Sequence, residues 1–179
     1  MKWLIASDIH GSAHYCRRLI DRFIDEKADR LLLLGDILYH GPRNDLPDGY
    51  APKEVADMLN GIKNSILCVR GNCDAEVDQL MLEFPIMSDY AAVDTGDRLI
   101  YATHGHIYNR SKLLPLKSGD ILLHGHTHVP VCENVDGITV MNPGSVSIPK
   151  DGSYHGCMIM ENGRFLWKDL EGNVQNEYL

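Results

Sequence analysis

The sequence lacks the features that mark several broad classes of protein. Its five cysteines are odd in number and scattered, and no two have the Cys-x-x-Cys spacing. This argues against a disulfide framework and a cysteine-type zinc site, and it fits a reducing compartment. No stretch approaches the ~18 continuous apolar residues of a membrane span, and the first apolar run, Trp3–Ala6, is too short for a signal peptide. We therefore expect a soluble, cytoplasmic protein without a membrane partner.

Positive charge is also scarce. Lys and Arg number 17 against 25 Asp and Glu, which gives a formal net charge of −8. Because a general nucleic-acid binder presents a positive face to phosphates, this balance argues against nucleic acid as a partner. The hydrophobic fraction of 44% and the charged fraction of 23% are ordinary for a globular protein. At 179 residues, the chain is expected to form one domain over 1–179.

The first half of the chain alternates predicted strands and helices. Short apolar runs that end in polar residues predict strands over 3–6, 31–34 and 66–69. Apolar residues at helical spacing predict helices over 12–26 and 53–62, with Ser12 as the N-cap of the first, and a short helix over 76–82. This alternation is typical of a parallel sheet.

The second half reads as strands joined by tight turns. Runs at 90–94 and 99–103, 131–135 and 138–141, and 157–160 and 165–170 flank turn sequences such as Asp-Gly and Asn-Gly, and 121–124 is a further apolar run. We expect these strands to form a second, mainly antiparallel sheet that packs on the first, with helices outside.

Histidine, in contrast, is abundant and clustered. The chain has nine histidines, and polar residues with metal-binding groups follow five of the predicted strands: Asp8, His10, Asp36, Asn72, His104, His126 and His128. In open α/β sheets, ligands bind at the carboxyl ends of the strands, so these side chains are expected at one edge. Imidazole, carboxylate and amide ligands suit Mn²⁺, Fe, Co or Zn²⁺ better than Ca²⁺. The set exceeds what one ion needs, which favours two ions that share a carboxylate.

Five ordered motifs carry a family resemblance. They are Asp8-Ile9-His10, Gly35-Asp36, Gly71-Asn72-Cys73-Asp74, His104-Gly105-His106 and Gly125-His126-Thr127-His128. In order and approximate spacing they resemble the calcineurin-like metallophosphoesterases. The segments Tyr39–Asn44 and Asn142–Ser147 extend the likeness to the small bacterial phosphodiesterases of that family, over nearly the whole chain.

The resemblance implies a four-layer α/β/β/α sandwich of two mixed β-sheets flanked by helices. It implies a small phosphodiester substrate and two divalent metal ions, with Mn²⁺ expected first and Zn²⁺, Fe, Co or Ni as alternatives. It assigns Asp8, His10, Asp36 and His128 to one ion, and Asp36, Asn72, His104 and His126 to the other, with Asp36 bridging. His104 is preferred to His106 because it directly follows the strand. A hydroxide between the ions is the expected nucleophile, because a bound divalent cation can lower the pKa of water to about 7.

One motif departs from the wider family. Cys73 stands where the commoner motif has a histidine that contacts the scissile phosphate. A chemical role and an inert packing role for Cys73 are both open, and Asp74 is the candidate for orienting a histidine. On the loop after Asp36, His40 and Arg43 are candidates for contacting the phosphate, since a guanidinium fork matches phosphate oxygens. The alternative for these two residues is ordering of the loop or a subunit contact.

Two other functions compete with the enzyme. A scaffold subunit of the same fold binds partners after losing key metal-site histidines, whereas this chain keeps every candidate ligand. A nuclease is disfavoured by the net charge of −8 and by the lack of residues for a capping domain. The sequence leaves open the physiological substrate and whether the protein is a homo-oligomer.

Overall fold

The first half of the chain folds as the alternating pattern predicts. The computed structural model describes residues 1–179. Its elements here are β1 (Trp3–Ala6), α1 (Ala13–Asp25), β2 (Arg30–Leu33), α2 (Pro52–Asn60), the 3-10 helix η1 (Lys63–Ser65), β3 (Ile66–Cys68) and α3 (Glu76–Gln79). Strands β1, β2 and β3 pair in parallel. Ser12 caps α1 as expected, because its hydroxyl accepts a hydrogen bond from the Tyr15 N–H at 3.2 Å.

The second half contains more strands than the turn pattern predicts. They are β4 (Tyr90–Asp94), β5 (Leu99–Thr103), β6 (Ile121–Leu123), β7 (Val131–Val135), β8 (Ile138–Asn142), β9 (Gly156–Glu161), β10 (Arg164–Asp169) and β11 (Val174–Tyr178). The last of these, β11, was not expected. The strand order is β11-β10-β9-β1-β2-β3 in one sheet and β4-β5-β6-β8-β7 in the other.

The expectation of a separate, mainly antiparallel second sheet is therefore wrong in two respects. Strands β9 to β11 return to the first sheet, where β9 pairs antiparallel with β1. Residues Gly156–Met160 of β9 are all buried, which is the pattern of a strand covered on both faces inside a sheet. In addition, β5, β6 and β8 pair in parallel, because the connections between them are long enough to cross over.

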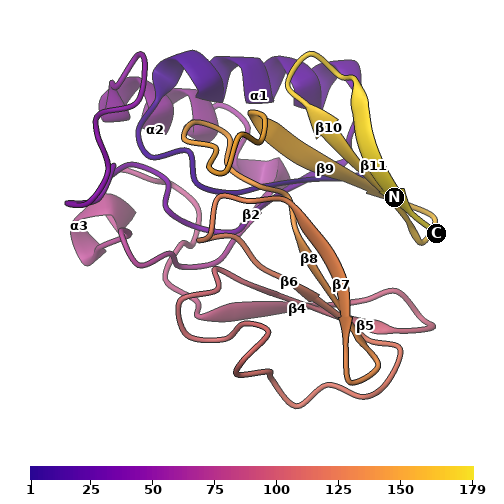
Figure 1. The fold of residues 1–179 in the computed structure, drawn as a ribbon. Helices are drawn as coiled ribbons and strands as arrows, with labels where there is room; N and C mark the ends of the chain where they lie inside the picture. The colour runs from indigo at the N-terminus through magenta and orange to yellow at the C-terminus, as the bar shows by residue number, and fades with distance from the viewer.

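The two sheets pack face to face, and helices α1 and α2 run along the outer face of the first sheet (Figure 1). A cluster that includes Ile5, Leu32, Met158 and Trp167 of the first sheet and Ile121 of the second fills the space between the sheets. A second cluster lies between the first sheet and the helices. The outer face of the second sheet is covered by the segment 104–120, whose Leu114 packs on Leu122 and Val140. No helix here has the length and apolar character needed to traverse a lipid bilayer.

The turns after the strands hold several candidate ligands in an unusual backbone conformation. Asp8, His10, Asp36, His126 and His128 all have positive φ, between 49° and 67°. This left-handed region costs a non-glycine residue roughly 1–2 kcal/mol, and such strain persists where surrounding contacts enforce it. The turns after β1, β2 and β6 are therefore shaped to direct these side chains, at the expense of local stability.

Candidate metal centre

The first group of candidate ligands is contributed by the turns after β1 and β6. The Asp8 Oδ1 atom lies 3.5 Å from His10 Nε2 and 3.3 Å from His128 Nε2. These two imidazole nitrogens are 3.2 Å apart. Asp8 and His10 are fully buried, and His128 is nearly so. The three side chains therefore converge on one point below the surface.

The second group surrounds Asp36 at the end of β2. Its Oδ2 atom lies 3.3 Å from His104 Nε2 and 3.7 Å from His10 Nε2, so Asp36 lies between the two groups. The His104 Nε2 atom is 3.1 Å from Asn72 Oδ1 and 3.2 Å from His126 Nδ1. The predicted ligand side chains thus come together, and Asp36 Oδ2 lies within 4 Å of a histidine from each group.

Backbone carbonyls fix the tautomers of three of these histidines. The Nδ1–H groups of His10, His104 and His128 donate to the carbonyl oxygens of Tyr39, Leu34 and Ile148, at 2.9, 2.7 and 2.7 Å. A neutral imidazole that donates from Nδ1 has a lone pair on Nε2. In its neutral form, each of these rings therefore aims the Nε2 lone pair at the carboxylates and at its neighbours.

Backbone N–H groups orient the two carboxylates in a matching way. Asp8 Oδ2 accepts the His126 N–H at 3.0 Å, and Asp36 Oδ1 accepts the Cys73 N–H at 2.8 Å. In each case the other oxygen points among the imidazoles. The buried Asp8 Oδ1 has no hydrogen-bond partner. Lone pairs and carboxylate oxygens that face one another at about 3 Å repel unless cations lie between them, so the donor set fits metal ions.

The ionisation of these groups follows from the same contacts. Burial alone would raise the pKa of Asp8, but the adjacent imidazoles of His10 and His128 hold it well below its usual range. Burial alone would lower the pKa of His104, but Asp36 and Asp8 raise it to about 9. Without cations, the buried carboxylates therefore recruit a proton to His104. A bound metal ion would supply the same positive charge and displace that proton.

Asp74 has a different role from the one expected of it. Its Oδ1 atom accepts the Ile37 N–H, and its Oδ2 atom accepts the N–H groups of Asp36 and Gly71, at 2.7 to 2.8 Å. The expectation that Asp74 orients a histidine is wrong, because its hydrogen bonds go to the backbone. It ties the turn after β2 to the turn after β3, and the three histidines are oriented by carbonyls instead.

The loop after Asp36 gives its two candidate residues different surroundings. A cleft of about 860 Å³ is lined by several of the candidate ligands and by Arg43. His40 is absent from its lining; the His40 ring packs against the rings of Tyr39 and Tyr50, with centroids 4.7 and 5.3 Å away. Cys73 lines the cleft, and burial together with Asp36 raises the pKa of its thiol.

Two cationic residues of the cleft were missed in the sequence. Arg70 and Lys150 both line it. Arg70 directly precedes the Gly71-Asn72 motif, so its place in the sequence could have predicted that it lies in the cleft. Lys150 reaches the cleft because two hydrogen bonds hold the segment after Asn142 against Asp8. The Asp8 carbonyl oxygen accepts hydrogen bonds from the Ser145 and Ser147 hydroxyls, at 2.9 and 3.1 Å. No local sequence pattern shows that contact.

Comparisons with known proteins agree with this geometry. A family model described as "Calcineurin-like phosphoesterase superfamily domain" matches residues 1–163. Phosphodiesterase YfcE of Escherichia coli (strain K12) is 46% identical over 162 residues, which span 90% of this chain and 88% of YfcE. Phosphodiesterase MJ0936 of Methanocaldococcus jannaschii is 31% identical over 153 residues, 80% of this chain and 83% of that protein. The solved structure of YfcE superposes with a TM-score of 0.96 at 41% identity, over 99% of this chain and 98% of that one, which confirms the expected α/β fold of two mixed sheets with flanking helices.

Proposed function

The chain belongs to the calcineurin-like phosphoesterase superfamily, and from this membership we propose that it is a metal-dependent phosphodiesterase with two metal ions, acting on a small phosphodiester. The observation that carries the proposal is the pair of buried carboxylates, Asp8 and Asp36. Each has one oxygen fixed by a backbone N–H and the other aimed among imidazole nitrogens. Burying two carboxylates among imidazoles costs free energy in the absence of metal, so the arrangement favours a metal-binding role.

The contacts support a division of the ligands between two ions. One ion would be held by Asp8, His10, Asp36 and His128, and the other by Asp36, Asn72, His104 and His126. His126 would bind through Nδ1, the ring nitrogen that faces His104 Nε2. The oxygen and imidazole donors are compatible with Mn²⁺, the metal we propose first, and also with Zn²⁺, Fe, Co or Ni.

Catalysis further requires an activated water, correctly oriented imidazoles and attraction of the anionic substrate. When bound, the two cations would lower the pKa of a shared water to give the attacking hydroxide, and would offset the charge of the phosphate. The carbonyls of Leu34, Tyr39 and Ile148 hold the imidazoles in the tautomer that binds metal. Arg43, Arg70 and Lys150 give the cleft a positive rim within a chain of net charge −8, which attracts an anionic diester.

The roles of Cys73, Asp74, Arg43 and His40 in turnover remain predictions. The surroundings of Arg43 favour contact with the phosphate, whereas those of His40 favour support of the loop. For Cys73, the raised pKa of the thiol leaves little thiolate at neutral pH, so it is unsuited to nucleophilic attack.

The test combines metal content with turnover. Protein purified with Mn²⁺ should contain two equivalents of metal by mass spectrometry and should hydrolyse bis(4-nitrophenyl) phosphate. The substitution Asp36→Asn should remove most of the metal and abolish turnover, since it weakens both sites. Asp21→Asn, at an exposed position of α1, is the matched control and should change neither. Full metal content in the Asp36→Asn protein would show that Asp36 does not bridge.

A further inference from the structure

A second cavity opens directly beside the metal cleft. It has a volume of about 410 Å³, and seven of its ten lining residues are hydrophobic. Three residues, Tyr39, Cys73 and Ala75, line both the cleft and this cavity, which we call the side pocket. Its other lining residues are Leu38, Tyr50, Pro52, Lys53, Val77, Asp78 and Met81. The two spaces therefore adjoin along these three residues.

The side pocket differs from the cleft in chemical character. Only three of the sixteen cleft residues are hydrophobic. In the side pocket, one oxygen of the Asp78 carboxylate is already engaged, since Asp78 Oδ2 accepts the Ala75 N–H at 2.8 Å. Val77 and Met81 are 63% and 44% exposed although they are apolar. An apolar surface that borders a polar active site is typical of a place where an apolar part of a ligand binds.

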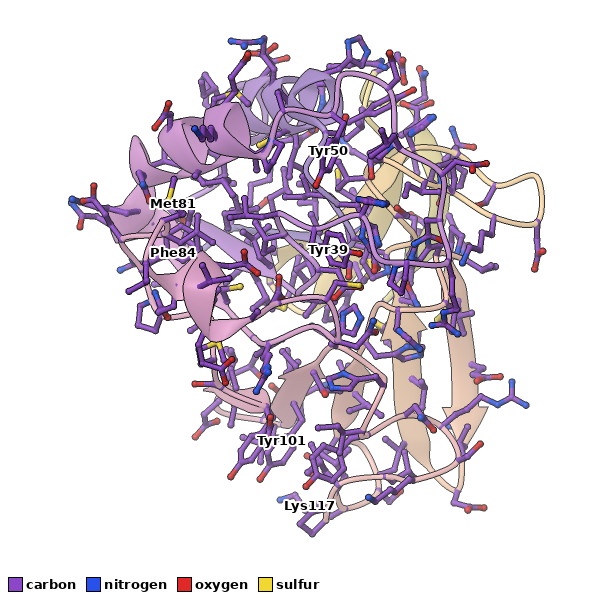
Figure 2. The ribbon with its side chains drawn as sticks, turned by 90° about the vertical axis from the view of Figure 1, so that its left-hand side faces the viewer. Tyr39, Tyr50, Met81, Phe84, Tyr101 and Lys117 are labelled. Atoms are coloured by element: carbon purple, nitrogen blue, oxygen red, sulfur yellow. The ribbon has the colours of Figure 1, made fainter.

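Aromatic rings form one wall of the side pocket, and they are braced. The His40 ring packs edge-on against both Tyr39 and Tyr50, and such contacts limit the movement of the rings. Figure 2 shows Tyr39 and Tyr50 near the centre of this side of the molecule, with Met81 to their left. The Tyr39 carbonyl also accepts the His10 Nδ1–H at 2.9 Å. The residue that orients a metal ligand thus also supplies a wall of the side pocket.

From this juxtaposition we propose that the side pocket binds an aromatic ester substituent of the phosphodiester while its phosphate lies at the metal centre. The inference rests on the proposed function and adds the class of substrate. Cys73 lines both spaces, and its N–H donates to Asp36 Oδ1 at 2.8 Å. A methyl or ethyl ester is too small to fill the side pocket. A sugar would bury hydroxyl groups against a mostly apolar wall, which costs free energy unless each finds a partner.

Competitive inhibition gives the first test, with bis(4-nitrophenyl) phosphate as the reporter. Diphenyl phosphate should inhibit at a concentration at least about tenfold lower than diethyl phosphate, which corresponds to about 1.4 kcal/mol. The double variant Val77→Thr with Met81→Gln keeps side-chain size but removes apolar character, and it should bring the ratio of the two inhibition constants close to one. Leu80→Gln is the matched control, because Leu80 is 84% exposed and does not line the side pocket. Its ratio should equal that of the unmodified protein.

A second measurement does not depend on turnover. With ¹³C-methyl-labelled methionine, the Met81 signal should move upfield on addition of diphenyl phosphate, because an aromatic ring would lie against it, and should not move with diethyl phosphate. If the Met81 signal responds but no diester is hydrolysed, the proposed function fails while ring binding stands. If diesters are hydrolysed and neither the signal nor the inhibition ratio depends on the ring, the side-pocket assignment is overturned. A Met81 signal that moves only with protein concentration would overturn it as well, in favour of a contact between copies of the chain.

Discussion

Removing divalent cations is expected to lower the stability of the native protein markedly. The cause is the pair of carboxylates, Asp8 at 0% and Asp36 at 2% exposure, whose free oxygens face imidazole nitrogens. A ligand that binds only the native state at a hundred times its dissociation constant adds about 2.7 kcal/mol. Two such sites add about 5 kcal/mol. For a domain of this size, that corresponds to a fall in Tm of about 10–20 °C on chelation.

The pH dependence of this loss has a definite sign. In the chelated protein the pKa of His104 is raised from 6.5 to about 9, so its protonation stabilises the native state below pH 6.5. That stabilisation is lost as the pH rises through about 9. In the loaded protein, His104 would bind metal as the neutral ring and would make no such contribution. The difference in Tm between loaded and chelated protein should therefore widen between pH 6.5 and pH 9.

Differential scanning calorimetry measures both the fall in Tm on chelation and its dependence on pH. Scans with Mn²⁺ and with a chelator, at pH 6.5, 7.5 and 9, should show a difference that grows with pH. The Asp36→Asn protein should respond weakly to the chelator, and the Asp21→Asn protein should respond like the unmodified one. A Tm that does not change when the chelator is added would refute the metal centre. A difference that is constant with pH would refute the assigned protonation of His104.

Two further predictions concern single residues. Cys73→His places a proton donor in the lining of the cleft, and positioned acid catalysis is worth ~10²–10⁴ in rate. Across a series of substituted phenyl esters, the rate of the variant should depend less steeply on leaving-group pKa, at unchanged metal content. Equal slopes for the two proteins would mean that position 73 takes no part in leaving-group chemistry. Burial alone would raise the pKa of Glu26, but Lys168 and Lys2, at 2.6 and 3.1 Å, lower it below 4.5. Glu26→Gln should therefore destabilise the protein in urea at pH 7, and the deficit should shrink as the pH falls through the lowered pKa; a deficit that does not change with pH would point to packing instead.

The convergence of the candidate metal ligands could be predicted from the sequence because of where they lie along it. Asp8 and Asp36 follow neighbouring parallel strands of the first sheet, and His104 follows a strand of the second sheet. Ligands gather at such carboxyl ends of strands. The strands themselves were predicted well where tight turns separated them. The return of β9 to pair with β1 was missed because a hairpin signal identifies only the neighbouring strand, not the sheet that a pair of strands joins.

The contacts that orient the ligands could not be predicted in the same way. The imidazoles are held by carbonyl oxygens, and every residue has one, so no residue type marks the acceptors. Asp74 was recognised as part of a motif, but its bonds to the backbone of Asp36, Ile37 and Gly71 depend on how two turns cross. Lys150 lines the cleft because hydrogen bonds from Ser145 and Ser147 hold its segment against Asp8. These residues are far apart in the sequence, so no local pattern predicts the contact.

The use of carbonyl oxygens as acceptors for His10, His104 and His128 also bears on how this centre can change during evolution. A point mutation can delete a side-chain acceptor but cannot delete a main-chain one. Substitutions at Leu34, Tyr39 or Ile148 can therefore reshape the surroundings while the imidazoles keep their tautomers. Insertions and deletions are different, because they shift the carbonyl itself. Across a library of variants, metal binding should survive changes of residue at Leu34, Tyr39 and Ile148 far better than changes of length in the loops 34–39 and 145–150.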